Sequence, residues 1–211
     1  MKTPVTSRSL KEHITYNWWK YLLIIAFSIG LVDILYTATA YKPPREKTVS
    51  FYVVGYVNED SLNAYMENVR ETEMPDMESV SATVLLQDDT YTAMQVLTYM
   101  SAGEGDLYML RRDDFLSYAE NGYLIPLEED AELISIFDQA GVSLQSGWRR
   151  NAETGETHLY GIPQDKLPGL SRYILSQNGY IGVVITGANT ENAMKFLRIL
   201  CRDMVTEPAL E

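Results

Sequence analysis

The chain has 211 residues, and 46% of them are hydrophobic, which is enough for a folded core and excludes general disorder. Its formal net charge is −12, and the residues after position 41 hold 13 basic and 27 acidic side chains, a net charge of −14. So acidic a region repels nucleic acid and anionic lipid headgroups, and nucleic acid is therefore excluded as a partner. We expect neutral, cationic or protein partners.

The first predicted element is a membrane-spanning helix over residues 21–41, close to the roughly 20 residues that cross a bilayer core. One charged residue, Asp33, interrupts it. Aromatic residues gather at both ends, as in the belts found at the two membrane interfaces. The belt residues are Trp18, Trp19, Tyr21, Tyr36 and Tyr41. This pattern predicts a cytoplasmic tail over 1–20, a single-pass signal-anchor and an extracytoplasmic domain that is held at the cell membrane.

Two alternatives stay open for this segment. Ala38-Thr39-Ala40 resembles a signal-peptidase site, where cleavage would release the domain, and the helix could also be a buried helix of a soluble protein. Asp33 is costly inside a bilayer, but it lies nearer the outer interface. It is either tolerated there or contacts another transmembrane helix. Pro43 and Pro44 then break the helix, and 42–48 is expected to form a short stiff linker.

The remainder, 49–211, alternates strand and helix patterns with short connections. Strands are predicted at 49–57, 80–86, 106–110, 158–162 and 180–186, and helices run through 62–69, 93–100, 115–119, 131–140 and 193–204. The second of these helices is expected to bury a face made of Ala93, Val96, Leu97 and Met100. This alternation predicts an α/β fold with a mostly parallel sheet flanked by helices.

The single cysteine, Cys201, lies within the last predicted helix and is expected to be buried. One cysteine can form neither an internal disulfide nor a cysteine cluster for a metal. Its position also excludes a lipoprotein signal, which places a cysteine just after the N-terminal apolar segment.

In open parallel α/β sheets, ligands lie beyond the carboxyl ends of the strands. Those ends are predicted near Tyr56, at 87–90, at 111–113 and at 186–189. The ligand-binding candidates are Tyr56, Asn58, Asp88, Asp89, Arg111 and Tyr160. Tyr56 and Tyr160 are expected to offer aromatic stacking surfaces.

Three motifs occur in a fixed order along this domain. Residues 105–127 contain GDLYML and FLSYAENGYLIPL, residues 160–163 read YGIP, and residues 189–197 read NTENAMKFL. Together they resemble segments of the extracellular solute-binding proteins of ABC importers. The resemblance implies one lobe of a periplasmic-binding-protein fold, a small-molecule ligand, and importer subunits or another envelope protein as partners.

The chain departs from that family after its YGIP segment. In the family this segment leads into a second α/β lobe, whereas here only residues 164–179 separate it from the next strand. A single lobe cannot trap a ligand by hinge closure. We therefore favour a non-enzymatic, membrane-anchored accessory or interaction module associated with transport. The alternative is open-face binding of a small solute such as a sugar or a peptide.

Signatures of catalysis are missing from the sequence. It contains no Walker A, dinucleotide-binding, nucleophile-elbow or zinc-protease motif, and its only histidines are His13 and His158. No cofactor and no metal are therefore expected. An envelope hydrolase that uses carboxylates such as Asp88 and Asp113 is the remaining enzymatic alternative.

Overall fold

The computed structural model describes residues 7–41, 43–86 and 91–206. The chain divides into two compact units, Met1–Lys42 and Pro43–Glu211.

The first unit contains one helix, α1 (Ser7–Thr39). Its part Thr15–Thr39 is long and apolar enough to cross a membrane by length and composition. The apolar N-terminal helix is therefore present, but it begins well before residue 21 and ends two residues before Tyr41. Helical backbone extends past the apolar stretch because the polar residues that precede it, such as Lys11 and Glu12, are good helix formers.

The second unit is built around a five-stranded sheet with the order β2-β1-β3-β7-β6. Its strands are β1 (Thr48–Val54), β2 (Ser79–Leu85), β3 (Leu107–Arg111), β6 (Ile162–Pro163) and β7 (Gly179–Val183). β1 pairs in parallel with β2 and β3, whereas β7 pairs antiparallel with β3 and β6. Four of the five strands therefore run in one direction, and the predicted α/β fold with a mostly parallel sheet is confirmed.

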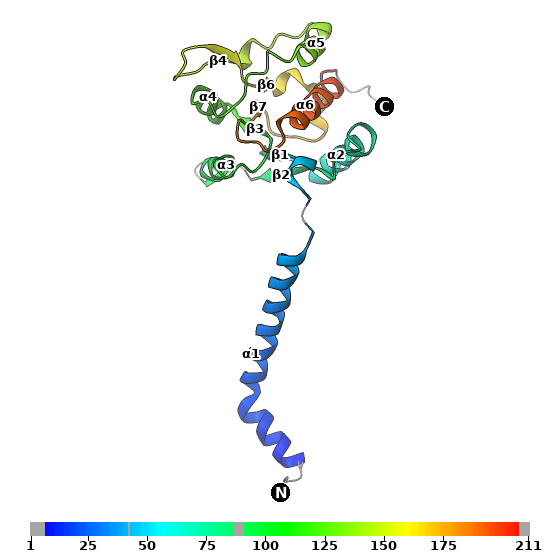
Figure 1. Cartoon of the computed structure of the whole chain (residues 1–211), viewed down its shortest axis with the longest axis vertical. Helices are drawn as coiled ribbons and strands as arrows, with labels where there is room; N and C mark the ends of the chain where they lie inside the picture. The colour runs from blue at the N-terminus through cyan, green and yellow to red at the C-terminus, as the bar shows by residue number, and fades with distance from the viewer. Residues whose placement is uncertain (1–6, 42, 87–90, 207–211) are drawn as a thin grey trace. The chain divides into compact units, whose positions relative to one another are not determined.

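Helices cover both faces of this sheet (Figure 1). One face is covered by α2 (Glu59–Glu73), α5 (Ala131–Ala140) and α6 (Thr190–Met204), and the other by α3 (Tyr91–Ser101) and α4 (Arg112–Glu120). Side chains alternate along β1 to fill both layers. Phe51 and Val53 belong to the core under α2, α5 and α6, whereas Val54 belongs to the core under α3 and α4.

Smaller elements complete the unit. A separate hairpin pairs β4 (Trp148–Arg150) with β5 (Thr157–Leu159), after the 3₁₀ turn η2 (Gln145–Gly147). In the described chain, the connection from β6 to β7 holds only two short 3₁₀ segments, η3 (Gln164–Lys166) and η4 (Pro168–Arg172). A second α/β lobe is not inserted at this point.

Part of the predicted linker belongs to the folded unit. Residues Arg45–Lys47 form the 3₁₀ turn η1, which leads directly into β1. The Arg45 guanidinium donates to the carbonyl oxygen of Gly103 at 3.1 Å. The Asn189 side-chain amide donates to the carbonyl oxygens of Glu46 and Thr48 at 2.7 and 3.2 Å. The chain therefore enters the sheet at the amino end of β1 through a fixed turn.

Candidate functional site

A pocket of about 640 Å³ opens beyond the carboxyl ends of β1 and β3. The chain leaves β1 toward β2 on one side and later crosses to β3 on the other side, so this pocket lies at the point where the strand order reverses. Such a switch point is where open α/β sheets bind ligands. The residues that line it are Val54, Tyr56, Met109–Asp113 and Ser176–Gly179.

Two residues selected from the sequence line this pocket. Tyr56 follows β1, and 63% of its surface is exposed, so its ring is available as a stacking surface. Arg111 ends β3 and precedes α4, and its Nε donates to Asp114 Oδ2 at 2.9 Å. This ion pair within one turn holds the guanidinium at the rim of the pocket.

The opposite wall of the pocket is the loop Ser176–Gly179, which Gln164 holds from both sides. The Gln164 side chain donates to the carbonyl oxygen of Ser176 at 2.6 Å and accepts from the backbone N–H of Gly179 at 3.0 Å. Within the loop, Asn178 has a φ of 64°, which is the left-handed region that asparagine tolerates better than most residues. The loop is thus fixed in an uncommon conformation at the edge of the pocket.

Ser176 packs against the backbone of Gly55 on the neighbouring strand end. Gly55 has a φ of 142°, and a Cβ atom placed on it would lie 2.3 Å from Ser176 Oγ. Only glycine combines this backbone conformation with so close an approach. Gly55 therefore sets both the direction of the chain into Tyr56 and the fit of the loop.

Charges of both signs meet at the pocket. Arg111, Arg112 and Asp113 line it, and α4 begins there without a side-chain cap on its first backbone N–H groups. In contrast, Asn58 caps α2 and Asp130 caps α5. Together with the Tyr56 ring and the amide groups of the loop, this lining suits a small polar solute.

The other sequence candidates lie elsewhere. Asn58 is the N-cap of α2, where its side chain accepts from the Ser61 N–H at 3.3 Å, and it does not line the pocket. Tyr160 is only 3% exposed and packs in the core under α3 and α4, so its ring offers no stacking surface. Asp88 and Asp89 lie outside the described residues.

The segment 186–189 lies at the opposite edge of the sheet from the pocket. β7 is antiparallel to β3, so the end of β7 meets the start of β3. Asn189 there donates its backbone N–H to Asp106, which also accepts from Ser50. Burial raises the pKa of this Asp106 carboxyl. The cluster joins η1, β1 and α6, and is a structural junction.

Sequence reasoning missed the residues that complete the pocket, namely Gln164 and the loop Ser176–Gly179. The loop stands at the amino end of β7, an antiparallel strand that the rule on carboxyl ends does not cover. Gln164 follows β6 and acts on the pocket only by holding this loop. The Gln-Asn-Gly run at 177–179 is a turn signal in the sequence, but it gives no information about which edge of the sheet the turn joins.

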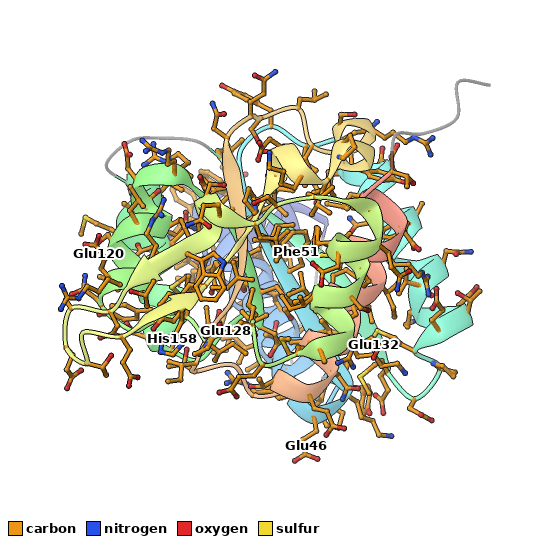
Figure 2. All side chains as sticks on the ribbon, turned by 90° about the horizontal axis from the view of Figure 1, so that it is seen from above. Glu46, Phe51, Glu120, Glu128, Glu132 and His158 are labelled. Atoms are coloured by element: carbon orange, nitrogen blue, oxygen red, sulfur yellow. The ribbon has the colours of Figure 1, made fainter. Side chains whose placement is uncertain are left out.

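His158 lies on the hairpin, away from the pocket lining. His158 and Glu128 are labelled close to each other in Figure 2. The Nδ1 atom of His158 is 2.5 Å from Glu128 Oε1, and the other oxygen of Glu128 accepts from the backbone N–H of Leu159. The hydrogen bond to Glu128 raises the pKa of His158 above its usual value. This contact fastens β5 to the segment before α5. Among the described residues, no group of three or more His, Cys, Asp or Glu side chains is placed to hold a metal ion.

No protein-family model matches the sequence, and no curated protein matches it either. Solved structures do match. An extracellular solute-binding protein of family 1 from Alicyclobacillus acidocaldarius has 21% identity and a TM-score of 0.43, over 58% of this chain and 28% of that chain.

Two further matches are the maltose-bound MalE3 of T. maritima and the maltose-binding periplasmic protein MalE of Listeria monocytogenes in complex with maltose. The first has 19% identity and a TM-score of 0.38, over 55% of this chain and 28% of that one. The second has 18% identity and a TM-score of 0.37, over 57% and 27%. The chain thus spans less than a third of these proteins. These solved structures are solute-binding proteins, the group that the motifs resemble, and the matches cover 55–58% of this chain.

Proposed function

We propose that this protein is a non-enzymatic, membrane-attached domain that binds a small polar solute in the open pocket beside Tyr56. The observation that carries the proposal is the pocket's place at the switch point between β1 and β3, with an exposed aromatic ring and polar groups converging there. The ring offers a stacking face for a sugar or for the side chain of a peptide. The Arg111 guanidinium can donate hydrogen bonds, the Asp113 carboxylate can accept them, and the amide groups of the loop can do both.

The affinity of such a site is expected to be weak. Ligand pockets normally bury most of the surface of their ligand, whereas a single lobe leaves one side of the ligand in water. We expect a Kd on the order of 0.1–1 mM, which corresponds to about 4–5.5 kcal/mol of binding free energy. Weak binding suits a domain that binds and releases a solute readily, in contrast to one that encloses and retains it.

Replacing Tyr56 with alanine is expected to weaken this binding by about tenfold, because the ring supplies stacking and apolar contact worth ~1.4 kcal/mol. The measurement is isothermal titration of the full-length chain in nanodiscs against sugars, amino acids and short peptides. Tyr91→Ala is the matched control, since Tyr91 is exposed to a similar extent but lies on α3, away from the pocket. A flat response of the unmodified chain to every probe would remove solute binding from the proposal.

The attachment to the membrane is part of the same proposal. Its support is the apolar helix α1, with aromatic residues at Trp18, Trp19, Tyr21, Tyr36 and Tyr41. In this proposal the N-terminal tail lies on the cytoplasmic side and the domain lies outside the cytoplasm. Asp33 lies past the middle of this helix. Extraction of membranes with alkaline carbonate should leave the full-length chain in the pellet. A chain that is recovered in the soluble fraction, shortened at Ala40, would show cleavage in place of anchoring.

The second proposed role is that of an accessory or interaction module beside an importer, and the surface of α3 favours it. That helix exposes apolar side chains in an otherwise acidic domain, as a protein contact surface does. Cross-linking from α3 to a transporter subunit would support this role, and the absence of any such cross-link would count against it.

A further inference from the structure

A second cavity, of about 450 Å³, lies between α5 and the β4–β5 hairpin. Its lining is mostly apolar and includes Phe137 on α5, and Trp148 and Leu159 on the hairpin. Trp148 and Leu159 are direct partners across the hairpin. The described lining of this cavity shares no residue with that of the pocket beside Tyr56. The hairpin therefore forms one wall of a cavity that is separate from the proposed solute site.

The attachment of β5 to the segment before α5 runs through Glu128. The backbone N–H of Leu127 donates to the carbonyl oxygen of Leu159 at 2.8 Å. In return, the N–H of Leu159 donates to one carboxylate oxygen of Glu128 at 3.0 Å, and the other oxygen lies 2.5 Å from His158 Nδ1. One carboxylate thus binds the ring of His158 and the backbone of the next residue. Loss of the contact to His158 leaves Glu128 free to turn away from the Leu159 N–H.

Charged groups reach His158 from three sides. Glu128 precedes α5, Glu156 precedes β5, and Arg149 is the partner of His158 on β4. The second ring nitrogen, Nε2, lies 3.4 Å from Glu156 Oε2, so each nitrogen has a carboxylate neighbour. The Arg149 guanidinium is directed toward α4, with its central carbon 5.8 Å from the centre of the Phe115 ring. The hydrogen bond to Glu128, with a smaller contribution from Glu156, raises the pKa of His158 because both carboxylates favour the charged ring.

We propose that His158 is a pH-operated clasp, which holds the hairpin closed over the cavity when its ring is protonated and releases β5 when the ring is neutral. The imidazolium has two N–H groups for its two carboxylates, whereas neutral imidazole has one and no charge. The ring also packs edge-on against Tyr160, with ring centres 5.7 Å apart, and this contact does not depend on the charge of His158.

The direction of the pH response follows from the raised pKa. The clasp is fully closed below the ordinary pKa of histidine, about 6.5, and its contribution is lost as the pH rises through the higher pKa of His158 in the closed hairpin. Because Trp148 and Leu159 form a wall of the cavity, release of β5 opens the cavity to solvent. Access to the cavity therefore increases toward alkaline pH.

The composition of the chain isolates this response. His158 is the histidine of the second unit, and the other histidine, His13, belongs to the first. Burial raises the pKa of the single thiol, Cys201, further from neutrality. Ordinary carboxyl and lysine groups titrate outside the range of about pH 6–9. A change in the hairpin within that range is therefore expected to follow the charge of His158.

The test is hydrogen–deuterium exchange of the full-length chain in nanodiscs, followed by mass spectrometry of the segment 157–161. Each exchange rate is divided by the intrinsic rate at the same pH, and the ratio measures how often β5 opens. This ratio should rise by about threefold to tenfold between about pH 5.5 and pH 9, because closing of the hairpin and protonation of His158 are linked. In the same samples, the ratio for a segment around Phe51 should stay constant, since that part of the sheet does not contact the clasp.

His158→Gln is the matched control. Its side-chain amide can still donate to Glu128 but has no charge to lose, so the ratio for 157–161 should no longer change with pH. Any contribution from the buried Asp106 carboxyl, whose pKa is also raised, would remain in this variant. Glu128→Gln should give a high ratio already at about pH 5.5 and should lower the pKa of His158, measured by NMR of the ring in a chain with His13→Gln.

Three results would overturn the proposal. The first is a ratio for 157–161 that is independent of pH in the unmodified chain, and the second is the same pH dependence in His158→Gln. The third is a pKa of His158 that is no higher in the unmodified chain than in Glu128→Gln. None of these measurements involves a solute, so the clasp and the proposed solute binding fail separately.

Discussion

Replacing Phe51 with alanine is expected to lower the free energy of unfolding of the second unit by about 3–5 kcal/mol. Phe51, which is labelled in Figure 2, is fully buried in the middle of β1. Its ring lies 6.3 Å from that of Phe196 on α6. The substitution removes apolar surface and leaves a cavity that the strands on both sides cannot close. Since small domains are stable by about 5–15 kcal/mol, most of the stability margin is lost.

Urea unfolding of the full-length chain in detergent, followed by near-ultraviolet circular dichroism, measures this effect. Met94→Ala is the control, since its side chain is largely exposed and its loss should change the free energy of unfolding by no more than about 0.5 kcal/mol. Similar midpoints for the two variants would show that the layer between β1 and α6 is not the packed core described above.

Replacing Gly55 with alanine is expected to lower the free energy of unfolding by about 2–4 kcal/mol and to abolish solute binding. The φ of 142° is strained for any residue with a side chain, at a cost of about 1–3 kcal/mol. The new methyl group would also lie 2.3 Å from Ser176 Oγ and force the loop Ser176–Gly179 outward. The pocket wall would therefore move even in molecules that fold.

Two comparison variants separate these effects. Gly141 also has a positive φ, 65°, but a Cβ there meets nothing within 4 Å, so Gly141→Ala should cost only about 1 kcal/mol. Adding Ser176→Gly to Gly55→Ala removes the clash and leaves the strain, so part of the lost stability should return. If Gly55→Ala costs no more than Gly141→Ala, the close packing of Gly55 on Ser176 does not hold in solution.

Most of the elements of the domain could be predicted because their signals are local. The uncharged apolar run of β1, and the helical spacing of Ala193, Phe196, Leu197 and Leu200 in α6, each appear within a few residues of one another. Buried Cys201 follows from the same helical period. Tyr56 and Arg111 could be placed at the pocket because they lie at the carboxyl ends of predicted strands that are neighbours in the sheet.

Other features depend on which elements meet. The face of α3 was predicted to bury Leu97, but the structure buries Thr92 and leaves Leu97 partly exposed. Because both faces of α3 are uncharged, the spacing of its hydrophobic residues does not show which face packs against the core. Tyr160 was expected at the surface, but it is buried in the core that also holds Phe115 and Tyr180, because the elements that meet there cover it.

The sequence alone determined that an apolar helix precedes an acidic α/β domain, and that this domain has no room for a second lobe after its YGIP segment. These properties are set by composition, by the period of apolar residues and by the length of a connection. Only the tertiary structure decided that β7 runs antiparallel, which moves 186–189 to the far edge and brings Ser176–Gly179 to the pocket. Strand direction depends on long-range pairing between residues such as Met109 and Ile181, and the local sequence pattern does not indicate it.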